Sequence, residues 1–237
     1  MMRVAYARVI ELGDHPRGMF GVAVARDDRH APCMWQWSSY YEAVDGRAPR
    51  PLLDDVLRRF AGDADGTPPS RPRAAVDLGS GDGTEAVALL DAGWRVYAVD
   101  SEPAAARRLT GKIDTVAARR LSIVTVDLAG YEPPPADLVW ASLSLLFVEP
   151  VGLAALWRRI RGALCPGGRF AGHFLGVHDT WADAPGTSAF DEQEVRTMMD
   201  GLEIERFVVR DEDGLAVSGP KHWHIFEVVA RRPGAML

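Results

Sequence analysis

Short apolar runs alternate with segments of helical spacing over the middle of the chain, which is the pattern of strands that alternate with helices. Five runs have the length of buried strands: residues 74–78, 94–99, 121–126, 138–143 and 169–175. Helices are expected over residues 84–91, from Pro103, and over 151–164, where apolar residues recur every three or four positions. Asp191, with Glu194 three residues on, predicts a capping box that opens a helix running to about residue 200.

This alternation predicts an α/β protein of the Rossmann-like, three-layer type, with a mostly parallel sheet covered by helices on both faces. The last two strand-like runs, 203–210 and 222–230, have no helix between them. Strands joined without a crossover helix must be antiparallel to each other. One terminal strand is therefore expected to run against the rest of the sheet.

The chain divides into four parts by its pattern: an extension over 1–34, a helical segment and linker over 35–73, the main domain over 74–231 and a tail over 232–237. In the extension, apolar stretches at 4–10 and 19–25 flank a turn signal, which fits either a hairpin or, as we favour, a poorly ordered segment. The second part holds an aromatic cluster, a helix over 52–60 that begins after prolines, and a Gly- and Pro-rich linker.

The charge and composition of the chain indicate which kinds of binding partner to expect. The formal charge of −6 argues against a domain that binds nucleic acid through phosphates. No apolar run approaches the ~20 residues that span a bilayer, and the first residues do not form a signal-peptide core, so we expect no membrane contact and a cytoplasmic protein. Cys33 and Cys165 lie far apart with no metal-ligand spacing, so no disulfide framework or metal site is expected.

A glycine-rich segment, residues 77–84, links the first expected strand to the first helix and reads Asp-Leu-Gly-Ser-Gly-Asp-Gly-Thr. Glycines permit positive φ and let a ligand approach the backbone, and ligands of open α/β sheets bind at this edge. Asp100 closes the second expected strand, where a carboxylate can accept both hydroxyl groups of a ribose. The pattern predicts a nucleoside site, with a tight turn that binds nothing as the alternative.

Two details distinguish between nucleoside ligands. The nicotinamide-nucleotide fingerprint G-x-G-x-x-G, counted from Gly79, requires glycine at position 84, where the chain has Thr84. Asp127 ends the third strand, where it can accept a hydrogen bond from the amine of adenine, beside the apolar Leu128. Asp77, ahead of the glycines, suits a ligand that carries an ammonium and a sulfonium group.

At these positions the chain resembles the class I methyltransferases that use S-adenosylmethionine (SAM). Residues 76–83 are similar to their first motif, residues 96–100 to their second, and residues 136–142 to the strand whose end faces the methyl group. Residues 142–147, Ser-Leu-Ser-Leu-Leu-Phe, are particularly similar to the tellurite-resistance type, whose members act on small molecules or are unassigned. The resemblance covers about residues 35–231 and implies a seven-stranded sheet of order 3-2-1-4-5-7-6 with the last strand antiparallel.

The resemblance also implies which residues bind the cofactor. Those candidates are Asp77, Gly79, Gly81 and Gly83 for the methionine part, Asp100 for ribose, Asp127 and Leu128 for adenine, Ser142 near the methyl group, and Ser101 as a further cofactor-binding residue. In related enzymes an aromatic helix folds over the cofactor and a basic residue pairs with its carboxylate, roles for which Trp37, Tyr41 and Arg47 are the candidates. Packing of the aromatic residues on the sheet, and a solvated charge for Arg47, are alternatives of equal weight.

The substrate side is less well defined, because methyl transfer requires a general base only when the acceptor must lose a proton. The strand ends place five residues near the expected pocket: Ser144, His178, Trp181, Lys221 and His222. His173, His178 and His222 are weak candidates for a base. Hydrogen-bonded histidines and a solvated lysine are the favoured alternative, and His178 with the adjacent Asp179 is a less favoured base pair.

The leading hypothesis is a SAM-dependent methyltransferase that acts on a small molecule and leaves S-adenosylhomocysteine (SAH) as its product. An oxidoreductase that uses NAD(P) shares the fold but is opposed by Thr84. A non-catalytic SAM-binding protein is the third hypothesis, because no general base is certain. We expect a monomer or homodimer. The residues do not indicate whether oxygen, nitrogen, sulfur or another atom receives the methyl group.

Overall fold

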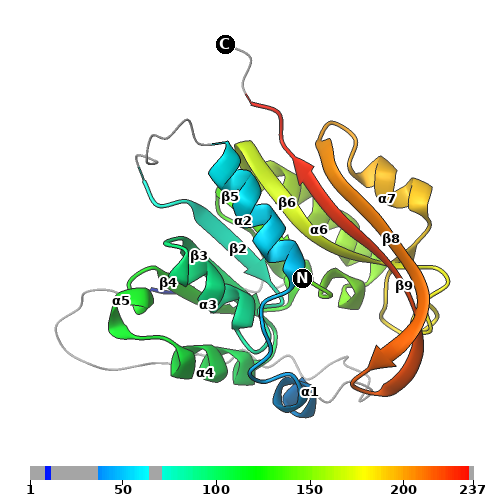
Figure 1. Cartoon of the computed structure of the whole chain (residues 1–237), viewed down its shortest axis with the longest axis horizontal. Helices are drawn as coiled ribbons and strands as arrows, with labels where there is room; N and C mark the ends of the chain where they lie inside the picture. Colours follow the sequence, from blue (N-terminus) through cyan, green and yellow to red (C-terminus); the bar gives the residue numbers. More distant parts are fainter. Residues whose placement is uncertain (1–8, 12–36, 64–70, 235–237) are drawn as a thin grey trace, which may run out of the picture.

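The computed structural model describes residues 9–11, 37–63 and 71–234. Its centre is a nine-stranded sheet in the order β1-β4-β3-β2-β5-β6-β9-β8, with β7 paired to β6 (Figure 1). The strands are β1 (Val9–Glu11), β2 (Ala74–Leu78), β3 (Arg95–Asp100), β4 (Leu121–Thr125), β5 (Ala136–Ala141), β6 (Leu164–Gly176), β7 (Ala189–Phe190), β8 (Glu203–Ala216) and β9 (Gly219–Arg231).

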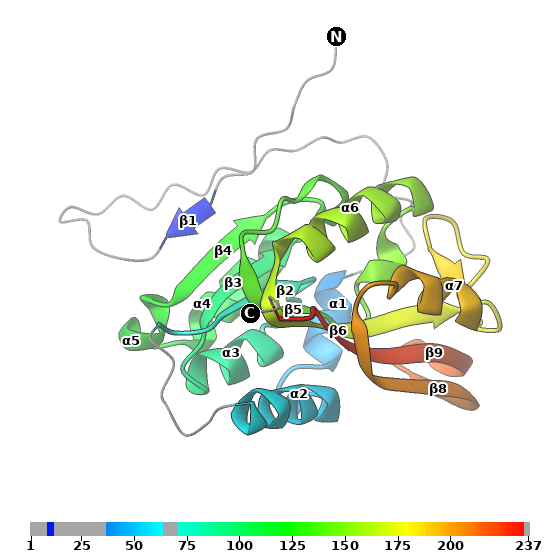
Figure 2. The same ribbon diagram turned by 90° about the horizontal axis from the view of Figure 1, so that it is seen from above.

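Helices cover both faces of this sheet, so the molecule has the three expected layers (Figure 2). They are α1 (Trp37–Ala43), α2 (Pro51–Gly62), α3 (Thr84–Asp91), α4 (Pro103–Lys112), α5 (Thr115–Ala118), α6 (Pro150–Ala163) and α7 (Glu192–Met198), with short 3₁₀ turns η1 (Leu128–Gly130) and η2 (Leu145–Phe147). Figure 2 shows α2 and α3 on one face and α6 on the other. Within the described residues, no helix is long and apolar enough to cross a membrane.

The predicted strand order is confirmed. The strands β4-β3-β2-β5-β6-β9-β8 stand in the order 3-2-1-4-5-7-6 of the methyltransferase fold, and β9 is antiparallel to both of its neighbours. The strand β1 adds to the edge of β4 in antiparallel pairing. Except for β1, the expected extension over 1–34 lies outside the described residues, so its proposed hairpin or loose packing stays a prediction.

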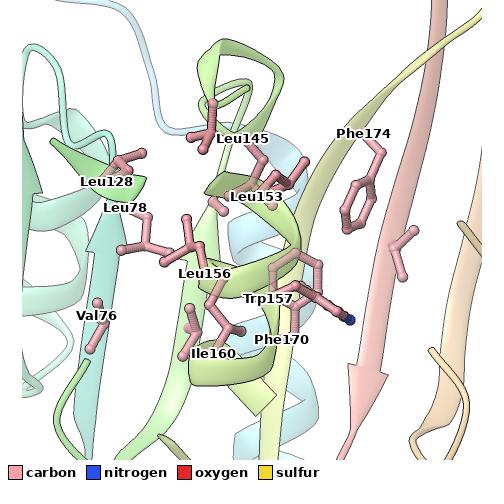
Figure 3. Close-up of a cluster of buried hydrophobic side chains, with 14 of the residues drawn as sticks. Val76, Leu78, Leu128, Leu145, Leu153, Leu156, Trp157, Ile160, Phe170 and Phe174 are labelled. Carbon is pink, nitrogen blue, oxygen red and sulfur yellow. The ribbon is translucent and has the colours of Figure 1, made fainter. Parts of the chain in front are cut away.

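The larger core cluster lies between the sheet and α6 (Figure 3). Leu156 and Ile160 of α6 are fully buried, and Trp157 packs edge-on against Phe170 of β6 with 4.8 Å between ring centroids. Full burial of one such side chain contributes ~1.5–3 kcal/mol, so this helix is held mainly by its apolar face. A second cluster packs α2, α3 and α4 on the opposite face. The two clusters fix the sheet on which the functional residues stand.

The final hairpin is longer than the sequence predicts. The apolar pattern places its strands at 203–210 and 222–230, but pairing continues through Asp211–His224 and Gly214–Lys221 to Ala216–Gly219. The acidic residues 211–213 and Gly214 interrupt the apolar pattern, although their backbone keeps the ladder. As a result the far end of the hairpin curves toward α1 (Figure 1).

Candidate functional site

A cavity of about 730 Å³ lies at the carboxyl ends of the parallel strands. Its lining comes from α1 and the segment that follows, from the glycine loop 79–83, from the ends of β3 and β5, and from the far end of the β8–β9 hairpin. In open α/β sheets this rim is where ligands bind. The cavity therefore coincides with the site expected from the glycine loop.

The glycine loop needs its glycines for two separate reasons. Gly79 and Gly81 have φ of +73° and +54°, a region that other residues rarely adopt. A Cβ at Gly79 would overlap the Ser144 side chain, and one at Gly81 would lie 3.4 Å from the Tyr41 ring. Gly83, also at positive φ, lies against Leu109 of α4 outside the cavity lining, and so it serves the packing of the loop.

Three buried oxygen atoms in the cavity lining have no hydrogen-bond partner among the described residues. They are Oδ2 of Asp77 and the Oγ atoms of Ser142 and Ser144. Burial, followed by the nearby carboxylates of Glu85 and Asp100, raises the pKa of Asp77 well above its usual value. Unsatisfied buried polar atoms are rare and costly, so a polar or cationic ligand at this position would stabilise them.

Asp100, at the end of β3, points its carboxylate at the glycine loop. It accepts hydrogen bonds from the backbone N–H groups of Gly81 and Glu102, each at 2.8 Å, and from the Tyr41 hydroxyl at 3.3 Å. Burial raises the pKa of Asp100 despite these donors. Tyr41 therefore already offers this carboxylate a hydroxyl donor, the kind of group that a ribose presents.

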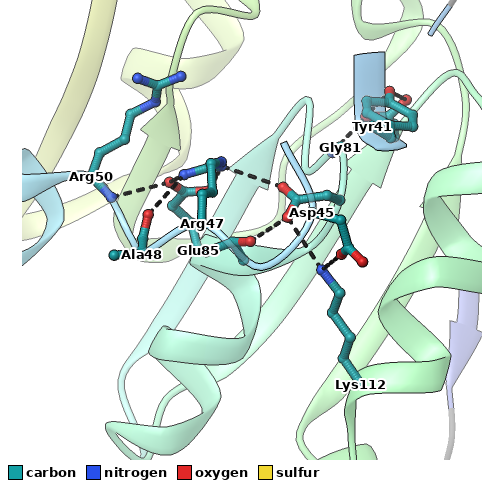
Figure 4. Close-up of polar contacts among 11 residues, drawn as sticks. Tyr41, Asp45, Arg47, Ala48, Arg50, Gly81, Glu85 and Lys112 are labelled. Atoms are coloured by element: carbon teal, nitrogen blue, oxygen red, sulfur yellow. Dashed lines mark hydrogen bonds and ion pairs between the residues drawn. The ribbon is translucent and has the colours of Figure 1, made fainter. Parts of the chain in front are cut away.

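Arg47 belongs to an ion-pair cluster beside the loop (Figure 4). Its guanidinium donates to both carboxylate oxygens of Glu85 at 2.6 and 2.5 Å and to Asp82 at 3.3 Å. Lys112 of α4 donates to the same Asp82 at 3.2 Å. Arg47 lines the cavity, but these carboxylates already balance its charge. The expected pairing of Arg47 with the cofactor carboxylate stays a prediction.

Aromatic residues of α1 cover the loop, as the sequence suggested. Trp37 stacks on Tyr41 with 6.2 Å between centroids and meets Phe147 of η2 edge-on at 4.8 Å. Trp37, Tyr41 and Phe147 all line the cavity. The aromatic cluster thus faces the cavity, and Tyr41 also donates a hydrogen bond to the Asp100 carboxylate.

Lys221 lies behind the cavity wall and does not line it. Its side chain is buried, pairs with Asp179, and places Nζ 3.6 Å from the centroid of Trp181 and 3.9 Å from that of Trp223. Asp179 also accepts hydrogen bonds from the backbone of Trp181 and His224. The sequence expected Lys221 at the mouth of the pocket, but Lys221 does not line the cavity. Lys221 and Trp223 lie on the same face of β9, and the Lys221 ammonium packs against the Trp181 and Trp223 rings, which do line the cavity.

None of the three histidine candidates is in the cavity lining. His178 and His222 lie on the outer side of the hairpin, where both bind Asp211, at 3.0 and 2.7 Å. His178 is therefore not oriented by the adjacent Asp179. His173 is buried beside Glu227 at 3.6 Å, and burial lowers its pKa.

Comparison with known proteins agrees with this geometry. Residues 76–170 match the family model described as a methyltransferase domain. No curated protein matches the chain. Among solved structures, TehB from Haemophilus influenzae aligns with 81% of this chain and 65% of its own, at 14% identity and a TM-score of 0.63.

Two further solved structures resemble the chain over most of their own length. One is the N-methyltransferase NodS from Bradyrhizobium japonicum with SAH, at 16% identity and a TM-score of 0.60, with 83% of this chain and 96% of that chain covered. The other is the 1,6-didemethyltoxoflavin-N1-methyltransferase from Burkholderia thailandensis with 1,6-didemethyltoxoflavin and SAH, at 21% identity and a TM-score of 0.57, with 83% of this chain and 84% of that chain covered. The resemblance to the class I SAM-dependent methyltransferases is confirmed by the family model over residues 76–170 and by the fold of these structures, which include TehB of the tellurite-resistance type and methyltransferases crystallised with SAH.

The other residues that the sequence predicted to bind the cofactor separate into two groups. Ser101 and Leu128 line the cavity together with the glycine loop. Asp127 is exposed and caps η1 by accepting from the backbone of Ala129 at 2.8 Å, and it is not part of the lining. Its expected contact with adenine stays a prediction.

Sequence reasoning missed several residues of the lining. Arg50 precedes α2, and Leu215, Ala216, Val217 and Ser218 form the far end of the hairpin. Gly219, at φ +115°, closes the turn there. The available signal was the run of three apolar residues, Leu215, Ala216 and Val217, between Gly214 and Gly219, because consecutive apolar side chains at the end of a hairpin can mark a binding surface.

Proposed function

We propose that the chain binds SAM in this cavity and transfers its methyl group to a small-molecule acceptor. The observation that carries the proposal is the set of unpartnered buried oxygens of Asp77, Ser142 and Ser144 on a floor shaped by left-handed glycines. We also propose that the protein is cytoplasmic and that it is a monomer or homodimer. Light scattering of the purified protein tests the assembly, and a larger oligomer contradicts it.

The residues present fit the cofactor. Asp77 offers a buried carboxylate to its ammonium group, Asp100 offers one to its ribose hydroxyls, and Leu128 offers an apolar surface to its adenine. When bound, SAM supplies an activated methyl group on a sulfonium. The protein's own contribution is to orient the acceptor in line with that methyl and to exclude water, and positioning of this kind can reach effective molarities of ~10⁵ M or more.

Titration of the purified protein with SAH and with NADH tests the cofactor. We expect SAH to bind with micromolar affinity and NADH not to bind. Binding of NADH alone would favour the oxidoreductase alternative. Transfer of a radiolabelled methyl group from SAM to any component of a small-molecule extract separates an enzyme from a non-catalytic SAM-binding protein, and its absence across broad extracts would favour the latter.

The raised pKa of Asp77 makes the binding of SAH depend on pH. The ammonium group favours the ionised carboxylate, so binding releases a proton wherever the free protein carries Asp77 protonated. Between the ordinary value of 3.8 and the raised value, affinity should increase with pH by up to about tenfold per pH unit, and it should level off above.

Calorimetry in buffers of different ionisation enthalpy measures this proton release. Asp77→Asn should abolish the release and flatten the affinity profile in that range. A wild-type profile that is flat, or that falls as pH rises, contradicts the assignment of Asp77 to the ammonium group.

A further inference from the structure

The cavity has two chemically different halves. Asp77, Asp82, Glu85 and Asp100 stand around the glycine loop, where the cofactor is proposed to bind. The half away from the loop is aromatic and aliphatic: Phe147, Trp181, Leu215, Val217 and Trp223. Binding sites are usually apolar with a few placed polar groups, so the second half is the place for the acceptor.

The two indole rings of this half are held in fixed positions. Trp181 and Trp223 meet at 65° with 5.7 Å between centroids, and the Lys221 ammonium lies against both. On the β8 side, a Cβ at Gly214 would lie 2.9 Å from Trp223 Cδ1, so the glycine allows this indole to lie close to the strand. A rigid aromatic wall selects flat molecules, which can stack on it or meet it edge-on.

The end of the hairpin adds exposed apolar surface at the same place. Leu215 is 79% exposed and Val217 is 57% exposed, and both are part of the cavity lining. Large apolar side chains left in water at the edge of a concave site commonly mark a binding surface. An apolar ligand in the cavity would remove them from water.

Two arginines line the described part of the cavity, and Arg50 is the one whose charge is not balanced by an acidic side chain. Arg47 is paired with Glu85 and Asp82, whereas no acidic side chain in the described part of the chain pairs with the Arg50 guanidinium. Only the backbone N–H of Arg50 contacts Glu85, at 3.3 Å, and Figure 4 shows its guanidinium pointing away from the Arg47–Glu85 pair. An arginine guanidinium without an acidic partner at a cavity is a strong site for a carboxylate or another anion.

The described lining also lacks a group suited to remove a proton from the acceptor. It contains no histidine, lysine or cysteine, and the Tyr41 hydroxyl has a pKa raised by burial and by Asp100. The carboxylates of the lining lie in the cofactor half. An acceptor must then arrive with its lone pair available, as an ionised oxygen or sulfur or an unprotonated nitrogen.

We propose that the acceptor is a planar, largely apolar aromatic anion whose ring lies against Trp181 and Trp223 and whose negative group pairs with Arg50. This inference rests on the proposed function. The acceptor lone pair forms the new bond to the methyl carbon, and the electron pair of the broken carbon–sulfur bond stays on sulfur. The sulfonium thereby becomes a neutral thioether, and no proton has to be removed by the protein.

The test compares two probes with the same ring system, the anion 1-hydroxy-2-naphthoate and its neutral methyl ester, which differ in charge and by one methyl group. They are titrated into the SAH-saturated protein by calorimetry. The naphthoate should bind at least tenfold more tightly than the ester. Arg50→Gln should abolish this difference and leave SAH binding unchanged. The matched control is Arg58→Gln, which replaces an exposed arginine of α2 outside the cavity lining. This variant should keep the difference in affinity between the naphthoate and its ester.

Each outcome is decisive for one of the two proposals. If SAH does not bind, the proposed function fails. If SAH binds and neither probe binds, the aromatic acceptor class is wrong while the function stands. Equal affinity of ester and naphthoate, or a charge preference that survives in Arg50→Gln, overturns the role of Arg50. Binding of cyclohexanecarboxylate as tightly as the naphthoate overturns the requirement for a planar ring.

Discussion

Asp100→Ala is expected to weaken SAH binding by about 100-fold or more. The carboxylate is proposed to accept both ribose hydroxyls, and hydrogen bonds to a charged group contribute roughly 1.5–3 kcal/mol each. The change also leaves the N–H groups of Gly81 and Glu102 without their acceptor, which loosens the glycine loop. Calorimetric titration with SAH measures the loss.

Two matched variants make this result specific. Asp91→Ala removes an exposed carboxylate at the end of α3 and should leave the affinity unchanged. Tyr41→Phe removes the hydroxyl that Asp100 accepts from the protein, and it should alter the affinity far less than Asp100→Ala. Unchanged SAH affinity in a folded Asp100→Ala protein would remove Asp100 from the cofactor site.

Lys221→Met should produce the largest loss of stability of any change considered, about 3–5 kcal/mol. The substitution keeps the length of the side chain but leaves the Asp179 carboxylate buried without its counter-charge. The backbone N–H groups of Trp181 and His224 still donate to Asp179 in this variant, but they do not neutralise the negative charge of its carboxylate. In a chain of this size that loss lowers the melting temperature by roughly 10 °C. Chemical unfolding monitored by circular dichroism measures the free energy directly.

The double variant Lys221→Met with Asp179→Asn removes both charges and should recover a large part of the lost stability. Recovery of stability without recovery of naphthoate binding would show that the cation also positions Trp181 and Trp223. A single variant as stable as the wild type contradicts the assignment of a buried charge pair.

The part of the fold built on local patterns could be predicted closely. The bounds expected for β2 and α3, residues 74–78 and 84–91, are those observed, because glycines fix where the strand ends and the helix begins. The capping box at Asp191 is also confirmed. The hairpin was underestimated because its outer pairs hold charged residues and a glycine, and only the neighbouring strand reveals that they continue the ladder.

The residues of the site differ in the same way: some follow from local sequence patterns, and others depend on contacts between distant residues. The glycine loop, Asp77 and Asp100 follow from one motif and the next strand end, and the structure brings them to one cavity. The pairs Arg47–Glu85 and Lys221–Asp179 join residues 38 and 42 positions apart, so the sequence does not reveal that these two cations are already neutralised. Arg50 was missed for the converse reason, since only the fold shows that it lacks such a partner.

The two outer edges of the sheet differ in how they resist aggregation. The edge at β8 carries charged, exposed residues such as Arg210 and Glu212, which disfavour the addition of another strand. β4 reads Leu-Ser-Ile-Val-Thr and has no charge, and within the described part of the chain its outer edge is covered by the three residues of β1. A shortened protein that begins after residue 11 would expose this strand to a second molecule, so truncations made for crystallisation should keep Val9–Glu11.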